Sequence, residues 1–193
     1  MPTGAPRSLA CRTLAACTGP DAPRETTMDQ RTQQFAELMK RPDIDQASAR
    51  YEQMYGETRQ RLVAEFPTLQ WRQSLEQTSA SCGNDFAAVN AGLRTHDAIV
   101  RGMGNWVGTG GFRDDQWERA LATVGEVAHQ YGFDAHPKVI ANQPGNHESI
   151  FRDEYNAELT FGVGKNVGLT FESGCHLTAE AKKRGTPAQG PSY

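Results

Sequence analysis

The segment 157–173, AELTFGVGKNVGLTFES, predicts a β-hairpin around which the rest of the chain folds. Apolar residues alternate with small or polar ones on both sides of Gly164-Lys165-Asn166, which suits a tight turn. Folding about Lys165 pairs residue 163 with 167, 161 with 169 and 159 with 171. Six apolar side chains then share one face of the hairpin: Leu159, Phe161, Val163, Val167, Leu169 and Phe171. This face needs a covering layer.

Two segments have the three- and four-residue spacing of apolar side chains that indicates a helix with one buried face. The first covers 43–66, with Asp43 as the expected N-cap and Gln46 completing a capping box. Gly56 lies inside it, where glycine costs about 1 kcal/mol relative to alanine and packing must offset that cost. The second covers 115–131, with Asp115 as the expected cap. A shorter helix is expected over 30–40.

Weaker strand patterns occur near 69–76, 97–107, 134–141 and 147–152. The order of elements predicts an α+β fold: an antiparallel β-sheet with helices packed on one face, and disordered N- and C-terminal tails. We expect four parts along the chain. They are 1–17, a signal-peptide remnant with a lipobox; 18–30, a linker; 31–179, the α+β domain; and 180–193, a disordered tail.

The residues before Cys17 predict a lipid attachment site. Leu14-Ala15-Ala16-Cys17 has the form of a lipobox, in which an aliphatic and two small residues precede a cysteine that becomes acylated. The polar, proline-containing segment 18–27 suits a tether. A signal peptide also needs an apolar stretch of about 7–15 residues, and Arg12 interrupts that stretch here. One explanation is that the chain as given starts too late; the alternative is that Cys17 is an ordinary thiol.

The charge balance excludes several classes of partner. The chain has 20 basic and 23 acidic residues, and removal of Arg7 and Arg12 with a signal peptide leaves 18 basic residues and a formal charge of −5. Proteins that bind nucleic acid present basic faces, so no nucleic acid partner is expected. No apolar run approaches the roughly 20 residues of a spanning helix. Membrane attachment is therefore expected through a lipid anchor at Cys17, on the extracytoplasmic side.

The cysteines point to the same compartment. Four cysteines allow three full pairings. If Cys11 leaves with a signal peptide and Cys17 carries lipid, Cys82 and Cys175 remain as one pair, which suits an oxidising environment. The alternative is two buried free thiols in a cytosolic protein. We expect the disulfide Cys82–Cys175.

The stretch GMGNWVGTGG at 102–111 leaves two interpretations open. Backbone exposed by glycines beside Trp106 could receive a ligand, which makes Trp106 the candidate ligand-contacting residue. Alternatively, the glycines mark a bulged strand that runs into a loop.

The histidines show no metal or catalytic spacing. His147 and Glu148 are neighbours in an expected strand, so their side chains point to opposite faces. We therefore predict no catalytic residue, no metal site and no cofactor, and not an enzyme. The histidines are His96, His129, His136, His147 and His176.

Several features together resemble the LppA-type lipoproteins of mycobacteria and related actinobacteria. They are Cys17-Thr18 followed by a polar linker with MDQ (28–30), ASARYEQM (47–54), Trp71 ahead of Cys82, GFRDDQWERALATVGEVAHQYG (111–132) and the hairpin that closes on SGCHL (173–177). The resemblance covers most of the chain after Cys17. It implies a cell-envelope lipoprotein whose biochemical role is not established, with no catalytic residues to carry over.

Two functions are therefore compared. The first is a non-catalytic, lipid-anchored domain that binds or scaffolds a protein or small-molecule partner outside the membrane. The alternative is an exported hydrolase or small-ligand carrier with a site near Trp106. A deep polar pocket lined by two or more of five residues would favour the alternative: His96, Asp97, His147, Glu148 and Asp153. A filled core with shallow surface grooves would favour the first.

Overall fold

The computed structural model describes residues 28–94, 96–110 and 113–189. The expected signal peptide, Cys17, residues 18–27 of the expected linker and residues 190–193 lie outside the described residues.

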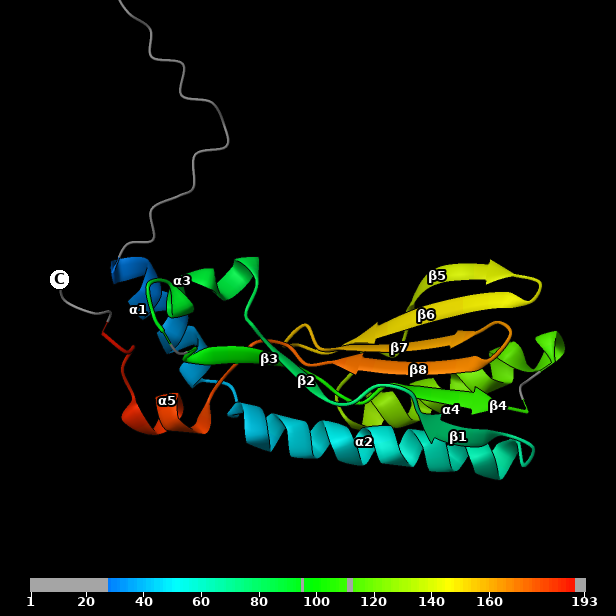
Figure 1. The fold of residues 1–193 in the computed structure, drawn as a ribbon. Helices are drawn as coiled ribbons and strands as arrows, with labels where there is room; N and C mark the ends of the chain where they lie inside the picture. The colour runs from blue at the N-terminus through cyan, green and yellow to red at the C-terminus, as the bar shows by residue number, and fades with distance from the viewer. Residues whose placement is uncertain (1–27, 95, 111–112, 190–193) are drawn as a thin grey trace, which may run out of the picture.

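The described strands form one antiparallel sheet (Figure 1). They are β1 (Gln70–Gln73), β2 (Thr78–Ser81), β3 (Ala98–Gly102), β4 (Trp106–Thr109), β5 (Lys138–Gln143), β6 (Asn146–Arg152), β7 (Glu158–Val163), β8 (Val167–Glu172) and β9 (His176–Leu177). The main order is β1-β4-β8-β7-β6-β5, while β3 pairs with the C-terminal end of β8, where Gly102 is opposite Glu172, and with β9 and β2. Every strand pair is antiparallel, as the order of elements predicts.

The described helices fall into two groups. The helices are α1 (Met28–Met39), α2 (Ile44–Glu65), α3 (Ala87–Asn90), α4 (Trp117–Gln130) and α5 (Ala179–Arg184), with 3-10 turns η1 (Asn84–Phe86) and η2 (Asp114–Gln116). The long helices α2 and α4 lie along one face of the sheet, whereas α1, α3 and α5 gather around β3 at one end of the molecule (Figure 1). The predicted α+β class with helices on one face is confirmed.

The central hairpin has the predicted register. Val163 pairs with Val167, Phe161 with Leu169, and Leu159 with Phe171. All six apolar side chains of the hairpin are buried. They pack against the buried faces of α2 and α4, which contribute Tyr51, Met54, Leu62, Trp117 and Val124 to the same core. Because each fully buried large apolar side chain contributes about 1.5–3 kcal/mol, this hairpin face is a main source of the domain's stability.

The ends of the two long helices agree with the sequence in one case and not in the other. Asp43 caps α2 and forms the predicted capping box with Gln46. The predicted cap at Asp115 is wrong, because η2 precedes α4 and the helix begins at Trp117. The carboxylate of Asp115 instead accepts hydrogen bonds from the Arg113 guanidinium at 2.8 and 2.9 Å.

The expected tail and linker are both shorter than predicted. Residues 179–184 form α5, which the hydroxyl of Thr178 caps and which ends at Gly185 with a φ of 74°. Beyond α5, the Ala188 N–H donates to Asp97, whose buried carboxylate also pairs with Arg184 at 2.6 Å. At the other end, α1 begins at Met28, so residues 28–30 of the expected linker are helical. At the C-terminal side, the Thr178 cap and one buried ion pair therefore order a segment that composition alone suggests is disordered.

Candidate functional site

The expected single strand at 97–107 is two strands, β3 and β4, separated at residues 103–105. The glycines in this region allow the segment 69–78, which contains β1 and the start of β2, to approach closely. A Cβ at Gly102 would lie 2.6 Å from the Thr78 hydroxyl, and one at Gly104 would overlap the Gln73 side chain. A Cβ at Gly108 would lie 2.5 Å from the Leu69 side chain. Close packing of two segments thus accounts for the glycines of 102–108.

Trp106 lies beneath α2 near one side of the sheet. It pairs with Leu169 in register, so its indole points to the face that α2 and α4 cover. The Arg59 guanidinium from α2 lies 4.0 Å from the centre of the Trp106 ring and 4.9 Å from that of Tyr55. The Tyr55 hydroxyl donates to the Leu169 carbonyl, which holds this ring in place. Trp106 is therefore one wall of an aromatic cluster around a single cation.

Arg59 has no acidic partner among the described residues. No ion pair or hydrogen bond from its guanidinium reaches the rest of the described chain, and its Nη1 is buried without a hydrogen-bond partner. Burial lowers the pKa of Arg59 from its usual value, because apolar surroundings disfavour the charged form. The cation is thus held by ring faces alone.

Two hollows meet at Arg59. The first, of about 310 Å³, is polar and includes Glu52, Gln73, Glu76, Gln77 and Trp106 in its lining. The second, of about 470 Å³, is lined by Gly56, Arg59, Gln60, Val63, Ala64 and Trp71. The second hollow is mainly apolar, and Arg59 is its charged residue. This pair of hollows is the place in the described structure where a small molecule would meet both Trp106 and an unpaired charge.

Sequence reasoning found Trp106 but missed Arg59. The available signal was the spacing, because Arg59 follows Tyr55 by four residues and therefore lies beside the buried stripe of α2. Trp106, by contrast, comes from β4, which is remote in sequence, so its contact with the arginine had no local signature.

A third hollow, of about 480 Å³, lies on the face of the sheet that the long helices leave uncovered. Its lining includes Glu76, Glu158 and Glu172. Glu158 and Glu172 are directly opposite each other on β7 and β8, and Arg152 pairs with Glu158. The arginine offsets the like-charge repulsion across these strands.

The five polar residues that would mark a catalytic pocket lie in separate places. His147 is buried, stacks on Trp117 and contacts Asp114 at 2.8 Å and Asn142 at 2.7 Å. Glu148 faces the opposite side of β6, as predicted.

Asp97 is occupied by Arg184, and His96 is exposed. Asp153 accepts from the Tyr51 hydroxyl at 2.5 Å and from two backbone N–H groups. Across the described residues, no three histidine, cysteine or acidic side chains form a group that could hold a metal ion.

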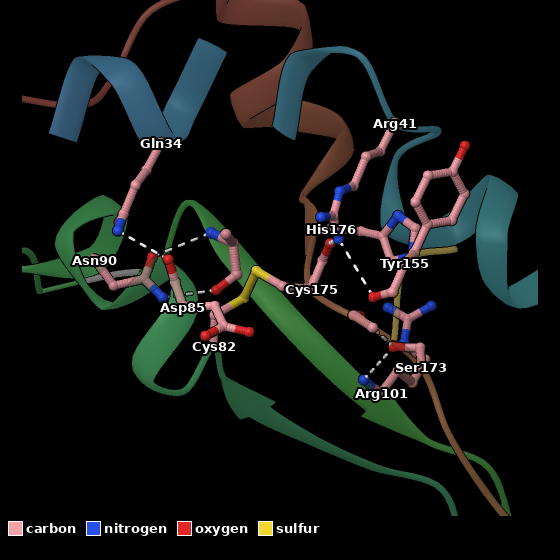
Figure 2. Close-up of a disulfide and its surroundings, with 12 residues drawn as sticks. Gln34, Arg41, Cys82, Asp85, Asn90, Arg101, Tyr155, Ser173, Cys175 and His176 are labelled. Carbon is pink, nitrogen blue, oxygen red and sulfur yellow. Dashed lines mark hydrogen bonds between the residues drawn. A yellow bond between two sulfur atoms is a disulfide. The ribbon is translucent and has the colours of Figure 1, made fainter. Parts of the chain in front are cut away.

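The predicted disulfide Cys82–Cys175 is present, with Cα atoms 5.5 Å apart. Figure 2 shows it between the segment after β2 and the segment before β9. Arg41 donates to the Cys175 carbonyl at 3.1 Å, and its guanidinium lies 5.2 Å from the centre of the Tyr155 ring. Phe35 and Leu38 of α1 belong to the same apolar cluster as the two cysteines. The bond therefore links the segments next to β2 and β9, beside the helix with which the described chain begins.

The comparisons with known proteins agree with this architecture. The crystal structure of the lipoprotein LppA from Mycobacterium tuberculosis aligns with a TM-score of 0.67 and 15% identity, over 84% of this chain and 95% of that one. A DUF4853 family protein from Actinomyces odontolyticus aligns with a TM-score of 0.53 and 13% identity, over 79% and 78%. At these identities the likeness shows a shared fold. No curated protein matches the sequence significantly.

The family assignment rests on sequence. A family model described as a lipoprotein confined to pathogenic Mycobacterium matches residues 20–179. Within the described part of the chain, no helix combines the length and apolar composition that crossing a bilayer requires. The match covers most of the chain, and the chain therefore belongs to the LppA family of lipoproteins.

Proposed function

We propose that the chain is a non-catalytic binding domain of the cell envelope, held on the extracytoplasmic side of the membrane by lipid on Cys17. The observation that carries this proposal is the position of the family match. The match begins at residue 20, three residues after the cysteine of Leu14-Ala15-Ala16-Cys17. A lipoprotein domain that starts directly behind a lipobox is the order expected of an acylated chain, with residues 18–27 as spacer.

Two further observations support export and lipid attachment. The Cys82–Cys175 disulfide suits an oxidising compartment. The chain from Cys17 has a formal charge of −5, so attraction to anionic lipid would not hold it at a membrane. A single acyl chain binds a protein only marginally, whereas the diacylglyceryl group of a bacterial lipoprotein supplies two chains.

Binding rather than catalysis is supported by the use of the polar side chains. The buried histidines and the buried or half-buried aspartates already bond to neighbouring side chains or backbone atoms. A general acid or base must instead reach the substrate. The unpaired Arg59 between its two hollows favours the binding of a small molecule over catalysis.

Detergent phase partitioning tests the anchor. The gene product is expressed in its own host, and the parent is compared with Cys17→Ser. We expect the parent in the detergent phase and Cys17→Ser in the aqueous phase. If both stay in the aqueous phase, the lipobox is a chance match. If both enter the detergent phase, something other than Cys17 anchors the protein, and the proposal is wrong.

A further inference from the structure

We propose that Arg59 and the apolar hollow beside it bind a small molecule that joins one anionic head group to an apolar body. This inference names the ligand class for the binding role proposed above and rests on that role. The proposed site consists of Arg59, Trp71 and the α2 residues Gly56, Gln60, Val63 and Ala64.

In the described chain, Arg59 lacks the counter-charge or acceptor oxygen that other partly buried arginines have. Other partly buried arginines contact an oxygen: Arg101 pairs with Asp45 at 3.0 Å, Arg184 pairs with Asp97 at 2.6 Å, and both Arg31 and Arg41 donate to backbone carbonyls. Arg59 has none in the described chain, although its guanidinium is partly desolvated. Because a desolvated charge is costly until it is paired, Arg59 favours an anion that arrives from outside.

The two hollows differ in how readily an anion can approach Arg59 through them. Glu52 and Glu76 line the polar hollow on one side of Arg59, and neither forms an ion pair with it. These carboxylates disfavour an anion there. The apolar hollow on the other side has no acidic residue in its lining. The head group would therefore reach Arg59 from the apolar side, where no carboxylate in the lining opposes its Coulomb attraction.

Gly56, which lines the apolar hollow, is an unusual residue for its position in the helix. This glycine lies in the interior of α2 at a cost of about 1 kcal/mol relative to alanine. No neighbouring contact requires a glycine there, because a Cβ at this position would meet nothing within 4 Å. The sequence predicts that packing offsets the cost of Gly56, whereas the structure shows open space at this position. Its absent side chain widens the apolar hollow, which gives the position a role in binding.

Trp71 and Val63 form the remaining wall of the apolar hollow. Trp71 is half-buried, and its Nε1–H has no acceptor in the described chain. Val63 is 38% exposed, which leaves an apolar surface beside the indole. An aliphatic or aromatic body can lie against these two side chains while its head group meets Arg59. Figure 1 shows β1, which carries Trp71, alongside the C-terminal half of α2.

Isothermal titration calorimetry tests the proposal with the full chain carrying Cys17→Ser, so that no acyl group of its own competes. The probes are decanoate for an acyl chain, 2-naphthoate for an aromatic acid, and decyltrimethylammonium for the opposite charge. We expect one or both anions to bind the parent at least about tenfold more tightly than the cation does. The anion that binds more tightly identifies the source of the apolar body.

Three variants locate the site. Arg59→Gln removes the charge, and Gly56→Leu fills the hollow; each is expected to weaken anion binding by at least about tenfold. Arg61→Gln is the matched control on the same helix, because Arg61 is exposed and pairs with Glu126. Its affinity should equal that of the parent. Circular dichroism establishes whether each variant is folded. If one of the two test variants is unfolded, the other still tests the site.

The results separate this proposal from the anchor. If neither anion binds the parent, or if Arg59→Gln and Gly56→Leu both bind like the parent, the proposal is overturned. Equal binding of anion and cation overturns the role of Arg59. The partitioning experiment depends on Cys17 and the titration on Arg59, so either can fail alone.

Discussion

His176 lies fully buried close to the disulfide, and only one of its ring nitrogens has a partner. Nδ1 donates to the Pro42 carbonyl at 2.9 Å, while Nε2 has no hydrogen-bond partner in the described chain. Burial lowers the pKa of His176, since a charged ring would lose its hydration without gaining an acceptor. The folded domain therefore holds this histidine neutral at pH values at which it is protonated in the unfolded chain.

This burial predicts a pH dependence of stability. The contribution of His176 is fully present above the unfolded-state pKa near 6.5 and is lost as the pH falls from there through the lower folded-state pKa. We expect the free energy of unfolding in urea to decrease from pH 7.5 to pH 5.5, and less so in His176→Gln. His136→Gln, at an exposed position, is the control and should keep the parent's slope. An unchanged slope in His176→Gln would contradict this account.

Phe161 tests the register of the central hairpin. Its side chain is fully buried and stacks on Trp117, with ring centres 5.3 Å apart. Phe161→Ala should lower the free energy of unfolding by about 3–5 kcal/mol, because it removes buried area and leaves a cavity. Thr160→Ala, one residue earlier on the opposite face, should cost less than about 1 kcal/mol. Similar losses from the two variants in urea unfolding would mean that the faces are assigned wrongly.

At the scale of elements, the disulfide stabilises the least massive part of the fold. The short helices α1, α3 and α5 share a small apolar cluster that is separate from the main core. Its buried members are Phe35, Leu38, Cys82, Val89, Ala98, Cys175, Leu177 and Ala181. A cluster of this size gives limited stability, so the disulfide supplies much of the stability of this end of the molecule.

Removal of the disulfide should therefore be costly. The cysteines are 93 positions apart, for which the chain-entropy model gives roughly 4–5 kcal/mol. We expect the double variant Cys82→Ser, Cys175→Ser to unfold at a lower urea concentration than the oxidised parent. Added reductant should leave its unfolding midpoint unchanged. The reduced parent should behave like the double variant. A double variant as stable as the oxidised parent would disprove the structural role of the bond.

Local signals explain which elements were predictable. The hairpin and α2 follow from alternation, helical spacing and the Asp43 cap, all contained within short windows. Strand β2 was not predicted, because TSAS is polar, all four residues are exposed, and only pairing with β3 makes it a strand. Helix α5 depends on the Thr178 cap and on contacts with the distant Asp97. Arg59 acquires its surroundings in the same non-local way, so the site was only half predictable from Trp106.

At the scale of the whole molecule, the described chain begins and ends at the disulfide end. Helices α1 and α5 lie there, whereas the β5–β6 and β7–β8 turns lie at the opposite end (Figure 1). A tether attached ahead of α1 would place the disulfide end nearest the membrane. The hollow beside Arg59, on the C-terminal half of α2, would then lie toward the end of the molecule away from the anchor.

The central claim is that the chain is exported, acylated on Cys17 and closed by one disulfide, and a count of free thiols tests all three parts together. The protein is purified from its own host, denatured and mass-tagged with a maleimide before and after reduction. The account predicts no tag before reduction, because Cys11 has been removed with the signal peptide, lipid occupies the Cys17 thiol, and Cys82 is bonded to Cys175. It predicts two tags after reduction. Any tag before reduction would contradict the account: one tag would show that Cys17 carries no lipid, and two or more would show an unprocessed chain or free thiols in place of the bond.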